Sequence, residues 1–363
     1  MPVIVKIGTS SLTDDEGHIR LAAIDKLCSE VAAVRAIGRQ VVLVTSGAIT
    51  AGLPALGFAG ARPKDPRTLQ AASAVGQSRL MALYEAALAR HGLVNGQILM
   101  SPFDFFERSQ YLHARGTLER LLELGVVPIV NENDAVADDA IRFGDNDRIA
   151  ALVAHLVGAE RLILLTDMAG LYTADPRSDE HATLVSEIAS IETVEGIDVS
   201  GAGTARGSGG MASKLSAARM AAWSGVTTVI AAADRPDVVA DAIAERPGVG
   251  TIIRPQPHPL SARKLWIAFA VEAHGRLRID EGASRALIAA GGSLLPVGVA
   301  EVEGRFDAGD AVDVFDHGGR HIARGLSAMS AEQLAQVKGV RNRDQAPGIP
   351  DEVIHRDELV VLV

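Results

Sequence analysis

Short apolar runs alternate with longer amphipathic stretches over about the first 255 residues of the chain. The apolar runs are rich in β-branched residues and predict strands at Val3–Ile7, Val41–Thr45, Gln97–Met100, Val126–Val130, Arg161–Thr166 and Thr227–Ala231. Stretches with apolar residues three and four positions apart predict helices at Ala22–Ile37, Leu69–Arg90, Leu112–Leu124, Arg148–Val157 and Met211–Ser224. This alternation predicts an α/β fold with a mostly parallel open sheet and helices on both of its faces.

The pattern changes after a group of three prolines at positions 255, 257 and 259. Beyond it, the sequence predicts short strands at Arg276–Ile279, Gly298–Val302 and Val312–Phe315, and one helix at Ala283–Ala290. Glycine pairs at 291–292 and 318–319 predict turns. We therefore expect an α/β domain over residues 1–255, a linker over 256–271, and a small β-rich domain with a C-terminal tail over 272–363.

Composition narrows the class of protein. The chain has 363 residues, with 48% hydrophobic and 22% charged residues, which is typical of globular domains. Cys28 is the single cysteine, which excludes a disulfide framework and a cysteine-based zinc site. The formal net charge of −10 argues against a general nucleic-acid-binding protein. Because no apolar run is long enough for a membrane span and no signal-peptide pattern opens the chain, we expect a cytoplasmic protein.

Polar residues gather where the predicted strands end. Five such clusters occur, at Lys6–Ser10, Thr45–Ala48, Asn131–Asp134, Gly144–Asp147 and Thr166–Asp167. In a parallel sheet the carboxyl ends of the strands share one edge, where ligands bind. Each cluster taken alone fits a turn, and Asp147 alone fits a helix N-cap. Together they predict a functional site at this edge.

Two lysines next to glycine-rich segments suggest a phosphate ligand. Lys6 precedes Gly8 at the end of the first strand, and Lys214 follows the glycine-rich turn Gly207–Gly210. Backbone amides in such turns bind anions, and a lysine adds positive charge. The spacing matches neither a P-loop nor a dinucleotide fingerprint. The pair therefore predicts a nucleotide-using enzyme of another kind.

The residue types suggest phosphoryl transfer, which depends on positioning and on charge stabilisation. Lys6 and Lys214 are expected to neutralise phosphate oxygens, with Asp147 holding both lysines in place. The amides and carboxylates of Asn131–Asp134 and Asn146 can bind a substrate ammonium and a substrate carboxylate. A carboxylate acceptor is already ionised near neutral pH and needs no general base. Ser46 lacks the sequence context of a covalent nucleophile.

Residues 1–255 resemble the amino acid kinase family. The matching segments are Val5–Ser10, Val44–Ile49, Ala74–Arg79, Asn131–Val136, Gly144–Asp147, Leu165–Asp167 and Gly170–Arg177. The chain departs from the usual motif at Ser208 and Ser213, where the family has threonine, and both serines keep the hydroxyl group. The alignment is less clear over Ser200–Arg206.

The resemblance implies ATP-dependent phosphorylation of the γ-carboxylate of L-glutamate to L-glutamyl 5-phosphate, the first step of proline biosynthesis. It implies ATP and Mg²⁺ as cofactors, without assigning the metal ligands. It places glutamate on Ser46, Asp134 and Asn146. The implied nucleotide-binding residues are Lys6, Gly8, Thr166, Asp167, Ser208, Gly209, Gly210, Met211, Ala212, Ser213 and Lys214. It also implies inhibition by L-proline, a homo-oligomer, and coupling to glutamyl-phosphate reductase.

The C-terminal region resembles a PUA domain, on the segments Asp280–Ala283 and Leu294–Gly298. PUA domains elsewhere bind RNA, which depends on basic residues. Residues 272–363 carry 10 Lys and Arg against 15 Asp and Glu, which disfavours RNA binding here and favours a regulatory or packing role. Two alternatives stay open: another amino acid kinase, acting on aspartate, carbamate or a nucleoside monophosphate, and an RNA-associated protein.

Overall fold

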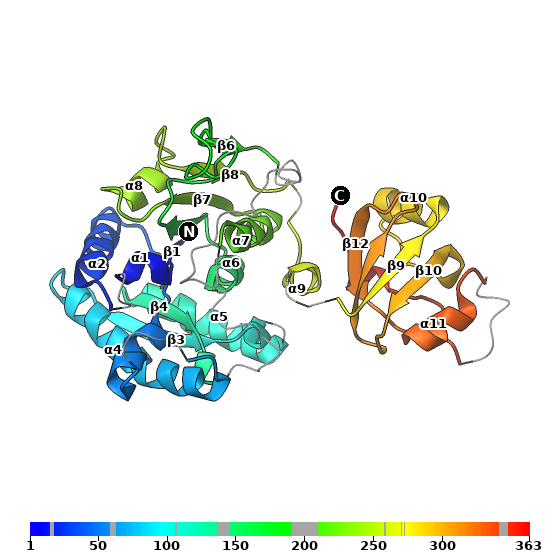
Figure 1. The fold of residues 1–363 in the computed structure, drawn as a ribbon, viewed down its shortest axis with the longest axis horizontal. Helices are drawn as coiled ribbons and strands as arrows, with labels where there is room; N and C mark the ends of the chain where they lie inside the picture. The colour runs from blue at the N-terminus through cyan, green and yellow to red at the C-terminus, as the bar shows by residue number, and fades with distance from the viewer. Residues whose placement is uncertain are drawn as a thin grey trace. The chain divides into compact units, whose positions relative to one another are not determined.

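The structure is a computed structural model that describes residues 1–14, 18–58, 63–105, 107–136, 146–190, 210–257, 259–269, 271, 273–340 and 348–363. Its contacts divide the chain into two compact units, Met1–Pro259 and Leu260–Val363. The first unit is an α/β structure and the second is rich in β-strands (Figure 1). The expected fold class is therefore confirmed.

The first unit is built on an eight-stranded sheet with the strand order β3-β4-β2-β1-β5-β7-β8-β6. The strands are β1 (Val3–Ile7), β2 (Val41–Val44), β3 (Asn95–Met100), β4 (Val127–Glu132), β5 (Arg161–Thr166), β6 (Glu187–Ile188), β7 (Thr227–Ala232) and β8 (Thr251–Ile253). Of the strand pairs that the structure describes in this sheet, only β7 with β8 is antiparallel. The carboxyl ends of β1, β2, β4 and β5 therefore lie at one edge, as expected.

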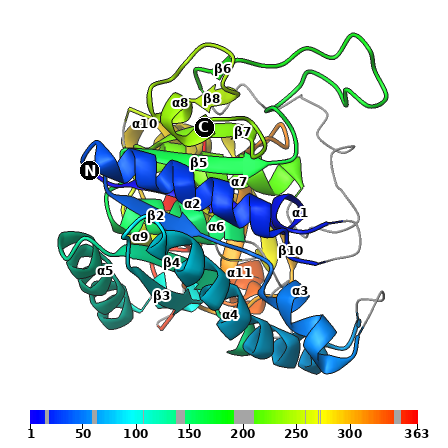
Figure 2. The same ribbon diagram turned by 90° about the vertical axis from the view of Figure 1, so that its left-hand side faces the viewer.

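Helices cover both faces of this sheet (Figures 1 and 2). They are α1 (Thr9–Leu12), α2 (Leu21–Ala36), α3 (Ala48–Gly52), α4 (Pro66–Ala89), α5 (Arg108–Glu123), α6 (Asn146–Leu156), α7 (Met211–Trp223) and α8 (Val238–Ile243). Figure 2 shows α2, α4 and α8 in front of the sheet, with α6 and α7 behind it. Because both faces are covered, β1, β2 and β4 are buried along their whole length.

Local sequence explains where the longest helix begins. Asp65 is the N-cap of α4 and its side chain accepts a hydrogen bond from the Thr68 backbone amide at 2.9 Å. Pro66 occupies the first helical position, where its missing N–H group costs nothing. Inward-facing residues of α2, α4 and α8 then pack with the apolar side chains of β1, β2, β5 and β7 in one core.

The second unit contains a five-stranded sheet with the order β10-β9-β11-β12-β13. Its elements are α9 (Ala262–Phe269), β9 (Gly275–Ile279), α10 (Glu281–Ala290), β10 (Val299–Gly304), β11 (Ala311–Phe315), β12 (His321–Leu326), α11 (Ala331–Val337) and β13 (Leu359–Val361). The segment 256–271, expected to be a linker, contains α9. Ile267 and Ala268 of this helix pack against Val360 and Leu362, so α9 lies in the core of the second unit.

Candidate active site

Lys6, Asp147 and Lys214 meet at one buried point of the first unit. Lys6 lies in β1, Asp147 in the first turn of α6, and Lys214 in the first turn of α7. The Nζ atom of Lys6 lies 2.6 Å from Oδ1 of Asp147, and Nζ of Lys214 lies 3.2 Å from Oδ2. Asp147 is 1% exposed and both lysines are buried. One carboxylate therefore holds two lysine side chains, the contact expected from the sequence.

The charges of these three residues favour binding of an anion. Burial raises the pKa of the Asp147 carboxyl, but the adjacent Lys6 and Lys214 ammonium groups outweigh this effect and hold the pKa below its usual range. Asp147 is therefore ionised near neutral pH, and the formal charges of the three side chains sum to +1. Ammonium groups such as these two can bind phosphate oxygens.

Gly8 and Gly210 lie in the backbone next to the two lysines. A Cβ atom built at Gly8 would lie 3.4 Å from Nζ of Lys6, so the backbone passes close to this ammonium group. Gly210 directly precedes α7, and its carbonyl accepts a hydrogen bond from the Lys214 amide at 3.3 Å. The N-terminus of α7 adds the positive end of a helix dipole.

The other residues of the expected nucleotide-binding segment differ in burial and in contacts. Met211 is buried and Ala212 is exposed. Ser213 donates a hydrogen bond from Oγ to Oδ2 of Asp147 at 3.3 Å, which joins it to the lysine cluster. Ser208 and Gly209 lie outside the described residues.

The three expected glutamate-binding residues lie at the same edge of the sheet. Ser46 follows β2 and precedes Gly47, which has a left-handed backbone with φ of 96°. Asp134 follows β4 and accepts a hydrogen bond from Oγ of Ser73 at 3.2 Å. Asn146 opens α6, and its Oδ1 accepts from the Glu132 backbone amide at 3.0 Å. In the described part of the chain, no hydrogen bond joins the Ser46 side chain to Asp134 or Asn146.

Asn146 and Asp147 connect the two groups of residues. They are consecutive at the start of α6, and both are buried. Asn146 contacts the end of β4, whereas Asp147 contacts the lysines of β1 and α7. The start of α6 therefore places an amide suited to an acceptor substrate directly beside the cationic cluster suited to phosphate.

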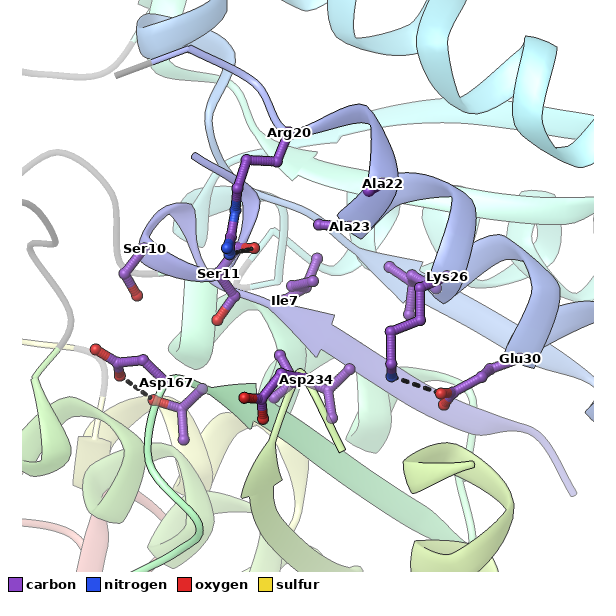
Figure 3. Close-up of a pocket in the computed structure, with 14 residues that line it drawn as sticks. Ile7, Ser10, Ser11, Arg20, Ala22, Ala23, Lys26, Glu30, Asp167 and Asp234 are labelled. Atoms are coloured by element: carbon purple, nitrogen blue, oxygen red, sulfur yellow. Dashed lines mark hydrogen bonds and ion pairs between the residues drawn. The ribbon is translucent and has the colours of Figure 1, made fainter. Parts of the chain in front are cut away.

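Thr166 and Asp167 line a separate pocket of about 410 Å³ at the carboxyl ends of β1, β5 and β7. Oγ1 of Thr166 donates to Oδ1 of Asp167 at 3.0 Å. Figure 3 shows Ser10 and Ser11 of α1 facing Asp167 across this pocket. The described residues that line it include none of the lysine cluster. The expected nucleotide-binding residues thus fall into two groups, one around Asp147 and one in the pocket.

Comparison with known protein families identifies both the α/β first unit and the β-rich second unit. Residues 1–232 match the model of the amino acid kinase family, which covers more than half of the chain. The chain belongs to the amino acid kinase family. Residues 275–344 match the model of the PUA domain, in agreement with the β-rich second unit. Both resemblances inferred from sequence motifs are confirmed.

Individual members of this kinase family are similar over the full length. A protein named glutamate 5-kinase from Frankia casuarinae is 48% identical, covering 99% of this chain and 96% of its own. One of that name from Azoarcus sp. is 47% identical, covering 99% of this chain and 97% of its own. A third, from Caldanaerobacter subterraneus subsp. tengcongensis, is 43% identical, covering 100% and 98%.

Two polar residues of this kinase were missed as site residues from the sequence. Ser73 contacts Asp134, and Gln77 accepts a hydrogen bond from Nδ2 of Asn131 at 2.8 Å through its Oε1. Both project from an otherwise apolar face of α4 that includes Leu69 and Leu80. Their spacing of four residues on a buried helix face was the available signal, because buried polar side chains require polar partners.

Two features are absent among the described residues. No group of three or more His, Cys, Asp or Glu side chains is arranged to hold a metal ion. No described helix is both long and apolar enough to cross a membrane.

Proposed function

We propose that this amino acid kinase transfers the γ-phosphoryl group of ATP to the γ-carboxylate of L-glutamate, which yields ADP and L-glutamyl 5-phosphate, the first step of proline biosynthesis. The observation that carries the proposal is the buried Asp147 between two lysines, with Asn146 immediately before it. The similarity to glutamate 5-kinases over the full chain supports glutamate as the acceptor.

The chemistry follows from the charges. A γ-carboxylate oxygen of glutamate attacks the γ-phosphorus of ATP, and the bond from that phosphorus to the bridging oxygen breaks as ADP leaves. The attacking carboxylate is ionised near neutral pH, so no protein base has to remove a proton. Lys6 and Lys214 stabilise the negative charge on the transferred group, and Asp147 positions both ammonium groups.

The residues that follow β2 and β4 are suited to binding the substrate glutamate. The Asp134 carboxylate is proposed to bind the substrate ammonium, with the Ser46 hydroxyl beside it. The Oδ1 atom of Asn146 is bound by the Glu132 amide, so its Nδ2 is the end that can donate to a substrate carboxylate. All three side chains are buried, which strengthens polar contacts with a ligand.

Nucleotide binding is proposed for Gly8, Thr166, Asp167 and the segment 208–214, together with Lys6. Mg²⁺ neutralises phosphate charge in reactions of this kind and is commonly held by the phosphates with one or two carboxylates. The pocket fits this arrangement, since the Asp167 carboxylate lines it.

Acceptor specificity tests the proposal against its alternatives. ADP release is measured with Mg²⁺ and glutamate, aspartate, carbamate or UMP, and hydroxylamine traps an acyl phosphate as a hydroxamate. We expect glutamate-dependent ADP release with an equal amount of hydroxamate. Release with UMP and no hydroxamate would identify a nucleotide kinase instead. Inactivity with every acceptor, with binding of RNA, would favour an RNA-associated protein.

Regulation and partners are proposed from the family resemblance. L-Proline resembles cyclised glutamate, so we expect it to compete at the glutamate site and to raise the apparent KM for glutamate. Because an acyl phosphate hydrolyses readily in water, direct transfer to a glutamyl-phosphate reductase would protect the product. A cytoplasmic homo-oligomer is proposed on the same resemblance. The excess of acidic residues in the second unit argues against RNA binding and supports a regulatory or packing role.

A further inference from the structure

Helix α4 presents a row of polar side chains to the strand ends. Ser73 donates to Asp134, Gln77 accepts from Asn131, and the hydroxyl of Tyr84 lies 2.8 Å from Oγ1 of Thr45. The three helix positions are separated by four and seven residues, which places them on one face. All three side chains are buried. This face of α4 therefore contacts the ends of both β2 and β4.

Close packing fixes α4 beside the proposed glutamate site. A Cβ atom at Gly76 would lie 1.8 Å from the Ala48 carbonyl oxygen, and one at Gly52 would lie 1.9 Å from that of Ala72. These distances are far below contact, so α3 and α4 pack directly through their backbones. Since α3 begins just after Ser46 and Gly76 precedes Gln77, the contact fixes Gln77 relative to the loop after β2.

Hydrogen bonds determine which end of the Gln77 amide is available. Oδ1 of Asn131 accepts from the Glu132 amide at 3.0 Å, so Nδ2 of Asn131 is the end that donates to Gln77. The oxygen of Gln77 is thereby used. Its Nε2 is buried, in a residue 7% exposed, and has no hydrogen-bond partner among the described residues. A buried donor without a partner is unfavourable unless a ligand supplies an acceptor.

We propose that Gln77 is a substrate-binding residue whose Nε2 donates a hydrogen bond to the α-carboxylate of L-glutamate. This inference rests on the proposed function. Gln77 and Ser73 lie one turn apart, and Ser73 contacts Asp134, the residue proposed to bind the substrate ammonium. The ammonium and the α-carboxylate share one carbon atom, whereas the γ-carboxylate must reach the lysine cluster. The α-carboxylate is thus the substrate acceptor nearest to Gln77.

Two variants of Gln77 test the contact through a split between KM and kcat. Gln77→Met removes the donor at similar volume, and we expect the KM for glutamate to rise roughly 10-fold, because the lost bond is to a charged group. Gln77→Glu places a carboxylate against the substrate, and we expect a rise of roughly 100-fold or more. The KM for ATP and kcat should change little in both. Gln97→Glu, on the exposed side of β3, makes the same charge change and should behave as the parent.

The outcomes separate this inference from the proposed function. If the parent releases no ADP with glutamate, the proposed function fails before any variant is measured. If the parent is active and Gln77→Met keeps its KM for glutamate, Gln77 does not bind the substrate. Equal rises in the KM for glutamate and in the KM for ATP would also overturn the assignment, because they would indicate a general disruption of the active site. Should both variants fail to fold, a crystal structure of the parent with L-glutamate decides: an α-carboxylate oxygen within hydrogen-bond distance of Nε2 supports the contact, and a more distant one refutes it.

Discussion

The first unit buries charged side chains, and the described part of the second unit does not. Lys6, Asp147 and Lys214 are buried together at the carboxyl end of a parallel sheet. In the second unit, Ser284 and Ser327 are the buried polar residues among those that the structure describes. Its described ion pairs are more exposed than the lysine cluster. The side chains of Arg278 and Glu301, 3.1 Å apart, are about half exposed, and those of Asp313 and Arg324 are 17% and 19% exposed.

This contrast indicates a difference in the cost of burying charge in the two units. Burying an ion pair costs more desolvation energy than a surface pair does, and apolar residues of the same volume often give a more stable protein. Surface ion pairs contribute little to stability and place few demands on the fold. The first unit therefore accepts a desolvation cost that the described part of the second unit avoids. Substitutions of equal size should therefore differ greatly in effect between the two units.

The largest effect is expected at Asp147. Asp147→Ala removes the carboxylate that positions both lysines, and we expect turnover to be abolished, a loss greater than roughly 10³-fold. The variant also leaves two buried ammonium groups without this partner, so its stability should fall. Circular dichroism at the assay temperature separates the loss of activity from unfolding. A folded variant that retains turnover and only raises the KM for glutamate would contradict the positioning role.

Substitution of either lysine of the cluster should have the next largest effect on turnover. In Lys6→Ala and Lys214→Ala, loss of one charge contact with the transferred group should lower kcat by roughly 10²- to 10³-fold, with a much smaller rise in the KM for glutamate. Lys338→Ala, at an exposed position of the second unit, provides the matched control and should leave both constants unchanged. Near-parental turnover in Lys214→Ala would remove that residue from the mechanism.

The sequence predicted the central strands well because their signal is local. β1, β2, β4 and β5 are apolar runs that are buried on both faces. The predicted ends of β1 and β5 match the structure, and those of β2 and β4 differ by one or two residues. Strands β6 and β8 were missed because they have two and three residues and depend on distant partners. Thr251 in β8 shows this dependence: its Oγ1 donates to the Val185 carbonyl at 2.6 Å and accepts from the Leu171 amide at 2.8 Å.

The arrangement of the candidate site was predictable where polar residues follow the ends of strands. Lys6, Asp147 and Lys214 were expected to meet, and the rule for parallel sheets explains why residues so far apart in sequence do so. The contribution of α4 could not be predicted in the same way. Ser73 and Gln77 lie mid-helix, and the close approach of Gly76 to α3 holds this part of α4 beside the strand ends. Such an approach is a tertiary contact that local periodicity does not encode.

Substitutions in the proposed glutamate site should have a smaller effect, which appears mainly in the KM for glutamate. Asp134→Ala and Asn146→Ala should each raise the KM for glutamate by roughly 10-fold or more and change kcat less, because these contacts exist in the ground state as well as the transition state. Steady-state kinetics with glutamate and ATP varied separately provides the test. If both variants instead lost kcat as Asp147→Ala is expected to, the assignment of Asp134 and Asn146 to glutamate binding would be wrong.

Removal of the second unit should affect catalysis least. The chain ending at Gln256 retains β8 and the whole eight-stranded sheet, and no residue proposed for chemistry lies beyond it. We expect a folded kinase with a kcat close to that of the full chain, since a compact domain with its own core can fold alone. Changed inhibition by proline would assign a regulatory role to the second unit. An insoluble or inactive product would show that the second unit is required for the fold of the first.

Substitution of Asp313 in the second unit should leave catalysis unchanged. Desolvation of this half-buried carboxyl opposes its ionisation, but His321 and Arg324 outweigh it and lower its pKa to about 2. Arg324 also donates to the carbonyl oxygens of Ala268 and Val271 at 3.2 and 3.1 Å, which joins Asp313 to the end of α9. Because the pKa is lowered on folding, the stabilisation is present above the ordinary aspartate range and is lost as pH falls toward 2.

Asp313→Asn should therefore reduce the free energy of unfolding of the second unit by about 1–2 kcal/mol at pH 7. The two tryptophans lie in different units, so Trp223→Phe leaves Trp266 in α9 as the fluorescent reporter of urea denaturation in the second unit. In this background, the difference in unfolding free energy between chains with and without the Asp313→Asn substitution should be present at pH 5 and shrink below about pH 4. A difference that persists unchanged at about pH 3 would show that the carboxylate charge is not the source of the stabilisation. Glutamate kinase activity at neutral pH should be the same in both chains, in contrast to the loss at Asp147.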